Sequence, residues 1–224
     1  SDLFQAKFAA KYLYDNLGKR KAAVVYVNND WGVGLKDAFS DTFKSLGGAV
    51  LSEEAYESAS KDLRTQMTKI ASSDADILYF AGYTDGTIAG LKQAKTLKVS
   101  KTIFGADAWD DSKIWSELGI AGDSAMFTVA KTNSSDLFKS KMAQKVGNDS
   151  LIYCSNYAYD NLKILAQVMS DVGTDSTKIK DALYKVIHVG GVSSPKIQFD
   201  VNGDLLESNY VVKVVKDGKA VEIK

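Results

Sequence analysis

The feature that most constrains this chain is an alternation, over its first 130 residues, of short apolar runs rich in β-branched residues with longer stretches of helical periodicity. Strands are expected at residues 22–27, 49–56, 76–81, 102–105 and 125–130, and helices at residues 4–17, 33–46, 61–72, 85–97 and 112–118. Strands that alternate with helices of about 10–15 residues are typical of a parallel sheet that helices cover on both faces. The sequence therefore predicts an α/β fold with a doubly wound, mainly parallel sheet.

The pattern changes after residue 131. Three successive helices are expected at residues 135–146, 155–172 and 176–187, with no strand between them. The second of these helices has an apolar stripe that includes Leu162, Leu165 and Met169. A stripe of this kind needs a covering layer, because an amphipathic helix buries its apolar side against another element.

The last segment reads as short strands at residues 196–200, 210–215 and 220–223, joined by Asn-Gly and Asp-Gly turns that are typical of antiparallel hairpins. These strands can extend the first sheet but are too short to supply a second one. We therefore expect a complete α/β lobe made of residues 1–131 and 200–224, and the helical portion of an incomplete second lobe at residues 132–199. The remainder of that second lobe is expected upstream of Ser1.

Charge and composition disfavour nucleic acids and membranes as partners. The 28 basic and 28 acidic residues cancel, so the protein has no long-range field of one sign. Arg20 and Arg64 are the only arginines, so little guanidinium is present for bidentate contacts to phosphates or base edges. No apolar run approaches the roughly 18–20 residues that span a bilayer. We expect no nucleic-acid partner.

The sequence offers little material for a catalytic or metal centre. Cys154 is the only cysteine, which excludes an intrachain disulfide and a cysteine metal cluster, and we expect it to be a small buried hydrophobe. His188 is the only histidine, so a metal site built on His pairs or a Ser-His-acid triad has no choice of partner, and we expect it at the end of a helix. The turn Gly32-Val33-Gly34 lacks the third glycine of a dinucleotide fingerprint and the ending of a P-loop. We expect no enzyme activity and no cofactor.

Three side chains follow directly after predicted strands, namely Trp31, Tyr83 and Asp107. In doubly wound sheets, ligands bind outside the carboxyl ends of the strands. Position alone therefore makes these residues candidates for ligand contact. Each also has a structural interpretation, with Asp107 as a helix cap or a solvated loop acid, Trp31 as a partly exposed loop aromatic and Tyr83 in a structural role alone.

Six short motifs occur in a fixed order along the chain. They are Ser1-Asp2 with Gln5, Asn29-Asp30-Trp31-Gly32-Val33-Gly34, Ala81-Gly82-Tyr83, Gly105-Ala106-Asp107, Asn156-Tyr157-Ala158-Tyr159-Asp160 and Phe199-Asp200-Val201-Asn202-Gly203-Asp204. Together with the order of elements, they resemble the type I periplasmic binding proteins, specifically the branched-chain (Leu/Ile/Val) amino-acid-binding family of ABC importers. The resemblance covers most of the chain and implies that most of the N-terminal lobe of such a protein lies outside it.

The resemblance also implies roles for individual residues. Asp107 aligns with the acidic residue that pairs with the α-ammonium group of the ligand, although relatives in this group carry the longer Glu there. Tyr83 matches an aromatic residue that lines the ligand cleft, and Trp31 stands where the family often has Tyr. Ile152 and Tyr153 stand where the family offers a side-chain contact from the first lobe.

The function implied is that of an extracytoplasmic solute-binding protein of an ABC transporter, which binds a branched-chain or similar apolar amino acid between two lobes. Its partners would be that amino acid and a membrane permease, with the missing N-terminal segment or a second copy covering the exposed helices. The location implied is periplasmic or extracellular, and a lipid-anchored precursor is compatible with it. A sensory amino-acid or amide-binding domain is the alternative, and a Rossmann-like enzyme is less favoured because no cofactor fingerprint is present.

Overall fold

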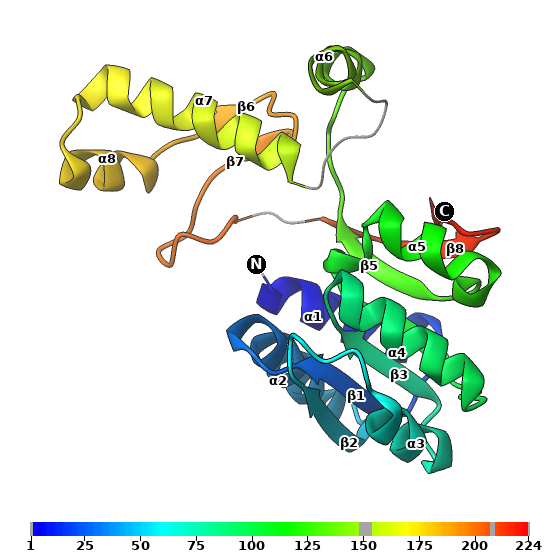
Figure 1. Ribbon diagram of the computed structural model, residues 1–224. Coiled ribbons are helices and arrows are strands. Elements are labelled where there is room, and N and C mark those ends of the chain that lie inside the picture. The colour runs from blue at the N-terminus through cyan, green and yellow to red at the C-terminus, as the bar shows by residue number, and fades with distance from the viewer. Residues whose placement is uncertain (1, 148–153, 207–208, 224) are drawn as a thin grey trace. The chain divides into compact units, whose positions relative to one another are not determined.

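The computed structural model describes residues 2–147, 154–206 and 209–223 (Figure 1). Its contacts divide the chain into two compact units, one made of residues 131–209 and the other of residues 2–130 and 210–224. The chain leaves the second of these units after Ala130 and returns to it at Tyr210, whereas the sequence placed this return near residue 200. Among the described residues, no helix is both long and apolar enough to cross a membrane.

The unit of residues 2–130 and 210–224 is built on a seven-stranded sheet with the order β2-β1-β3-β4-β5-β8-β9. Its strands are β1 (Lys21–Val27), β2 (Ala49–Tyr56), β3 (Ile77–Ala81), β4 (Thr102–Gly105), β5 (Met126–Ala130), β8 (Tyr210–Lys216) and β9 (Lys219–Glu222). Strands β1 to β5 pair in parallel, whereas β8 pairs antiparallel with β5 and with β9. The C-terminal hairpin therefore extends the parallel sheet.

Helices cover both faces of this sheet. They are α1 (Asp2–Lys11), the π-helical η1 (Tyr12–Asn16), α2 (Asp30–Ser45), α3 (Arg64–Ser72), α4 (Thr84–Thr96), the 3-10 helix η2 (Asp107–Trp109), α5 (Ser112–Leu118) and the 3-10 helix η3 (Gly119–Gly122). Because successive strand side chains point to opposite faces, Val25 and Phe80 pack with Leu91 of α4 in one core cluster, while Val24 packs with Phe39 of α2 in the other. The predicted doubly wound α/β fold is confirmed.

The start of α2 differs from the prediction, and this start shapes the candidate site. The pattern Asn28-Asn29-Asp30 reads as a loop, but α2 already begins at Asp30 because Asn29 caps it. The Asn29 side chain accepts a hydrogen bond from the backbone amide of Gly32 at 2.9 Å, which satisfies one of the donors left open by a helix start. Trp31 therefore lies in the first turn of a helix rather than in a loop.

The unit of residues 131–209 is mainly helical. Its elements are α6 (Asp136–Val146), α7 (Ser155–Val172), α8 (Ser176–Leu183), β6 (His188–Val189) and β7 (Lys196–Ile197). β6 and β7 form a two-stranded antiparallel ladder. A small core of Ile164, Val168 and Ile197, joined by partly buried side chains such as Leu183 and Phe199, holds α7, α8 and β7 together.

Two expectations for this unit are wrong. His188 does not end the third helix, because α8 stops at Leu183 and His188 instead begins β6, where it pairs with Ile197. Cys154 is exposed rather than buried. It is the residue directly before α7, and its backbone has a left-handed conformation with a φ of 67°.

A buried carboxylate organises the loop between β6 and β7. Asp160, on α7, is only 1% exposed and accepts hydrogen bonds from the amide of Val192 at 3.1 Å, the amide of Ser193 at 2.7 Å and the Ser193 hydroxyl at 2.5 Å. Gly191 packs so closely that an added Cβ would lie 2.8 Å from the Asp160 Oδ2 atom. The side chain of Asn133 donates to the Gly191 carbonyl at 3.1 Å. This carboxylate therefore fixes the loop of residues 190–195 against α7.

Candidate ligand-binding site

The sheet brings the three predicted site residues to one edge. β1, β3 and β4 are neighbours in the sheet and run in parallel, so their carboxyl ends meet at the same edge. Trp31 follows β1, Tyr83 follows β3 and Asp107 follows β4, which orders the three along this edge. Neighbouring strands lie about 4.8 Å apart, so the loops that carry these residues are adjacent.

Trp31 and Tyr83 form a preassembled aromatic wall. Their rings stack with centroids 4.6 Å apart and an interplanar angle of 17°. The Asn29 side chain donates to the Tyr83 hydroxyl at 3.4 Å, which ties the phenol to the start of α2. Gly32 allows α2 to start this close to β1, because an added Cβ would lie 2.0 Å from the Val27 carbonyl oxygen.

Tyr56, the last residue of β2, packs against the backbone that carries Tyr83 of the aromatic wall. Burial raises the pKa of the Tyr56 phenol above its ordinary range, although a hydrogen bond from the Tyr83 backbone opposes this shift. The Tyr56 hydroxyl fills the space that side chains at Gly82 and Gly86 would need, since an added Cβ would lie 2.8 Å and 2.5 Å from it. The neutral phenol therefore fixes the backbone on both sides of Tyr83.

Asp107 is half-buried and is held on both sides. Its backbone amide donates to the Oε1 atom of Gln5, a nearly buried side chain of α1, at 3.1 Å. On the other side, the fully buried Trp109 ring occupies the space of a side chain at Gly105, where an added Cβ would approach it to 2.1 Å. Burial is the main cause that raises the pKa of the Tyr79 phenol, and the negative charge of Asp107 raises this pKa further. The Asp107 charge therefore acts on a fully buried side chain of the core.

Polar contacts join the loops that follow β3 and β4. The Thr84 hydroxyl donates to the Asp111 Oδ2 atom at 2.6 Å, and Lys113 forms an ion pair with Asp85 at 3.2 Å. The N-cap position of α4 belongs to Tyr83 and has no side-chain cap. The side chains of Thr84 and Asp85 instead reach Asp111 and Lys113 at the start of α5, and so they join the loop after β3 to the segment after β4.

The structure thus places Trp31, Tyr83 and Asp107 on adjacent loops, while Ile152 and Tyr153 lie outside the described residues. Position after a strand was the signal that found the first three. Sequence reasoning missed the supporting roles of Asn29 and Tyr56, and assigned no bond to Gln5, because their contacts join segments far apart in the chain. Trp109 and Trp115 are buried and belong to the core of the sheet unit. The described residues contain no group of three or more metal-ligating side chains.

The mainly parallel sheet, with Trp31, Tyr83 and Asp107 on loops at its carboxyl edge, is the geometry in which α/β proteins bind ligands. The family described as "Periplasmic binding protein" matches residues 5–219. The chain belongs to this family, whose members are substrate-binding proteins rather than enzymes, and the resemblance found in the sequence is confirmed.

Similar proteins carry the names of amino-acid-binding proteins. The chain is 28% identical to the Leu/Ile/Val-binding protein BraC3 of Rhizobium johnstonii, over 97% of this chain and 60% of that protein. It is 23% identical to the leucine-, isoleucine-, valine-, threonine- and alanine-binding protein of Pseudomonas aeruginosa, over 100% of this chain and 61% of that protein. The chain therefore spans about 60% of the length of these relatives.

Solved structures show the same fold. The leucine-binding protein LivK of Thermotoga maritima superposes with a TM-score of 0.90 at 27% identity, over 100% of this chain and 65% of that one. A solute-binding protein of R. palustris in complex with benzoate superposes with a TM-score of 0.83 at 15% identity, over 100% of this chain and 62% of that one. The second likeness is one of fold alone.

Proposed function

We propose that this chain supplies one wall of a cleft that binds a free amino acid for an ABC importer. The observation that carries the proposal is the placement, on adjacent loops of one sheet edge, of the Asp107 carboxylate and the stacked wall of Trp31 and Tyr83. A zwitterionic amino acid presents a cation next to an apolar side chain, which matches a carboxylate next to an aromatic surface.

In the proposed pose, the ammonium group of the ligand donates to Asp107. The ligand side chain lies on the outer surface of the aromatic wall, because rings 4.6 Å apart are already in contact and leave no space between them. The family resemblance assigns the ligand carboxylate to hydroxyls and backbone amides of the first lobe, and a side-chain contact to Ile152 and Tyr153.

The whole protein is proposed to have two lobes, with residues 2–130 and 210–224 in one complete lobe and residues 131–209 in part of the other. It would work outside the cytoplasm and dock on a membrane permease. Family membership, the names of the relatives and the share of their length that this chain spans support this organisation.

Calorimetry on the protein encoded by the complete reading frame tests the ligand proposal. The panel consists of leucine, isoleucine, valine, phenylalanine and benzoate. Asp107→Asn is expected to weaken amino-acid binding about tenfold or more, because a hydrogen bond to a charged group is worth about 1.5–3 kcal/mol. Asp41→Asn, on an exposed position of α2, is the control. Equal affinity for the Asp107→Asn protein and the unaltered protein would refute the assigned role.

The 224 residues by themselves are expected to bind leucine weakly or not at all, because the family resemblance places the groups that hold the ligand carboxylate in the part of the first lobe outside these residues. Tight leucine binding by this chain alone would contradict a site built from two lobes. The role of Asp107 would still be tested by the calorimetry of Asp107→Asn in the complete protein.

A further inference from the structure

Asp107 lies on a short turn whose own backbone bonds are few. In η2, the Trp109 amide donates to the Ala106 carbonyl at 3.1 Å, and the Asp110 amide donates to the Asp107 carbonyl at 2.9 Å. A 3-10 turn of this length has poorer hydrogen-bond geometry than an α-helix and gains little rigidity from its own bonds. The place of the Asp107 carboxylate on the sheet edge therefore depends on contacts from other elements.

Two of these contacts come from helices. Gln5 of α1 accepts a hydrogen bond from the Asp107 amide at 3.1 Å, which holds the start of the turn. The indole of Trp115 on α5 donates to the Trp109 carbonyl at 2.9 Å, within the buried core of the sheet unit. The first and last residues of η2 are thus attached to different helices.

A third contact comes from β8 and is an ion pair. The Nζ atom of Lys213 lies 2.6 Å from the Oδ1 atom of Asp110, and these two side chains are only 25% and 27% exposed. Lys213 stands opposite the fully buried Phe127 of β5 in the antiparallel ladder, so its aliphatic stem leaves the sheet beside the apolar core. Because the pair is partly buried, salt and water screen it less than a surface pair.

We propose that Lys213 is a positioning residue for ligand binding, because its hold on Asp110 fixes the turn that carries the Asp107 carboxylate. This inference rests on the proposed function and adds to that site a residue from a strand that lies 103 positions after Asp110. A binding group needs to be held within about 0.5 Å of its productive place, and contacts of this kind are what hold it there.

The charge of Lys213 and its hold on the turn have opposite effects on an amino-acid ligand. The ammonium group of Lys213 repels the ammonium group of the ligand, so loss of this charge alone would strengthen binding, by about twofold through screened solvent. Loss of the hold on Asp110 lets the Asp107 carboxylate move and weakens binding. The direction of the change in affinity therefore separates the two effects.

Calorimetry with leucine on the protein from the complete reading frame makes this measurement. Lys213→Met keeps a side chain of similar length without the charge and is expected to weaken leucine binding about five- to tenfold. Lys213→Arg keeps the ion pair and should stay within about twofold of the unaltered protein. Lys216→Met, at an exposed position of the same strand, is the control and should show no change. Equal or tighter leucine binding by Lys213→Met would overturn the inference.

A double-mutant cycle tests whether Lys213 acts through Asp110. Asp110→Ala should weaken leucine binding about as much as Lys213→Met, and the double variant should bind no more weakly than the weaker single variant. Losses that simply multiply would show that the two residues act separately, which contradicts the proposed route. A lysine that only stabilised the fold would lower the thermal midpoint of the protein and leave leucine affinity unchanged below that temperature.

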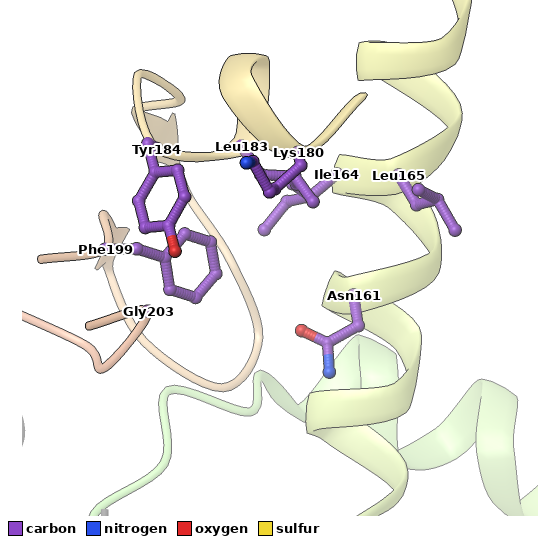
Figure 2. A pocket seen from close by; sticks show the side chains of 8 residues that line it. All are labelled: Asn161, Ile164, Leu165, Lys180, Leu183, Tyr184, Phe199 and Gly203. Carbon is purple, nitrogen blue, oxygen red and sulfur yellow. The ribbon is translucent and has the colours of Figure 1, made fainter. Parts of the chain in front are cut away.

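The same variants distinguish the turn from other places where leucine could bind. The helical unit has an apolar pocket of about 440 Å³ between α7, α8 and the segment that follows β7, and Figure 2 shows the rings of Tyr184 and Phe199 next to each other there. Lys213 and Asp110 belong to the other compact unit. Leucine held in the pocket would be insensitive to the Lys213 variants, and that result counts against the inference.

Hydrogen exchange on the 224-residue chain tests the positioning without any ligand. In Lys213→Met, the amides of Asp107 and Asp110 should exchange about tenfold faster, because the turn opens more often, while Lys213→Arg and Lys216→Met should leave them unchanged. Unchanged exchange in Lys213→Met would overturn the inference. A complete protein that binds no amino acid would refute the proposed function instead, and the exchange rates would still decide whether Lys213 positions the turn.

Discussion

Removal of the Asp160 charge is expected to weaken the helical unit strongly. In Asp160→Asn, the remaining carbonyl oxygen can still accept from the Val192 amide, but the new amide nitrogen faces the two donors of Ser193. The serine hydroxyl can turn to accept a hydrogen bond, whereas the Ser193 amide is left buried and unpaired. An unsatisfied buried donor costs about 1–3 kcal/mol, and loss of the charge weakens the remaining bonds, so we expect about 3 kcal/mol in total.

Urea unfolding followed by far-UV circular dichroism measures this change. With a slope of about 2 kcal/mol per M, the midpoint of the affected transition should fall by about 1.5 M. Hydrogen exchange at the amides of residues 190–195 should accelerate as well, because their anchor is lost. Asp171→Asn is the matched control, since Asp171 is exposed on the same helix and bonds only to Gln167 within the described contacts. A midpoint shift no larger than that of the control would show that Asp160 does not anchor the loop.

Three further changes have expected outcomes. Gly105→Ala should unfold the sheet unit at a lower temperature and alter the near-UV signal, since an added Cβ would lie 2.1 Å from the Trp109 ring. Gly32→Ala should shift amide resonances at the end of β1 and the start of α2, because its Cβ would lie 2.0 Å from a backbone oxygen; unchanged spectra would contradict this close approach. Asp62 should titrate with a pKa of about 2, lowered by hydrogen bonds from Arg64. Arg64→Gln should return the pKa of Asp62 toward its ordinary value, which NMR titration measures. Because folding lowers this pKa, the small contribution of the Asp62–Arg64 pair to stability is present at neutral pH and is lost as the pH falls toward 2.

The sequence predicts regular elements well where local pattern and packing agree. The limits of β2, β4 and α5 coincide with the residues expected, because each is an apolar or periodic run bounded by polar turn residues. β6 was missed because two residues carry no periodicity. Its pairing of His188 with Ile197 depends on a loop held by a carboxylate some 30 residues earlier.

The sequence predicted where the site residues lie on the sheet, but not the contacts that hold them there. A residue that follows a buried strand in an alternating pattern lies at the carboxyl edge of the sheet, so Trp31, Tyr83 and Asp107 could be placed from the sequence. The stack of the two aromatic rings and the bond from Asp107 to Gln5 join residues that are 52 and 102 positions apart. Local pattern contains no information on such contacts, which depend on the strand order.

The place of β8 in the sheet has a consequence for synthesis on the ribosome. β5 ends at Ala130, but its antiparallel neighbour begins only at Tyr210, 80 residues later. At about 5–20 residues per second, translation leaves the outer edge of β5 uncovered for about 4–16 s. During that time the nascent chain presents unpaired backbone donors and acceptors that any extended segment can join. The outer edge of β5 is therefore the place in this sheet where we expect non-native strand pairing before β8 is made.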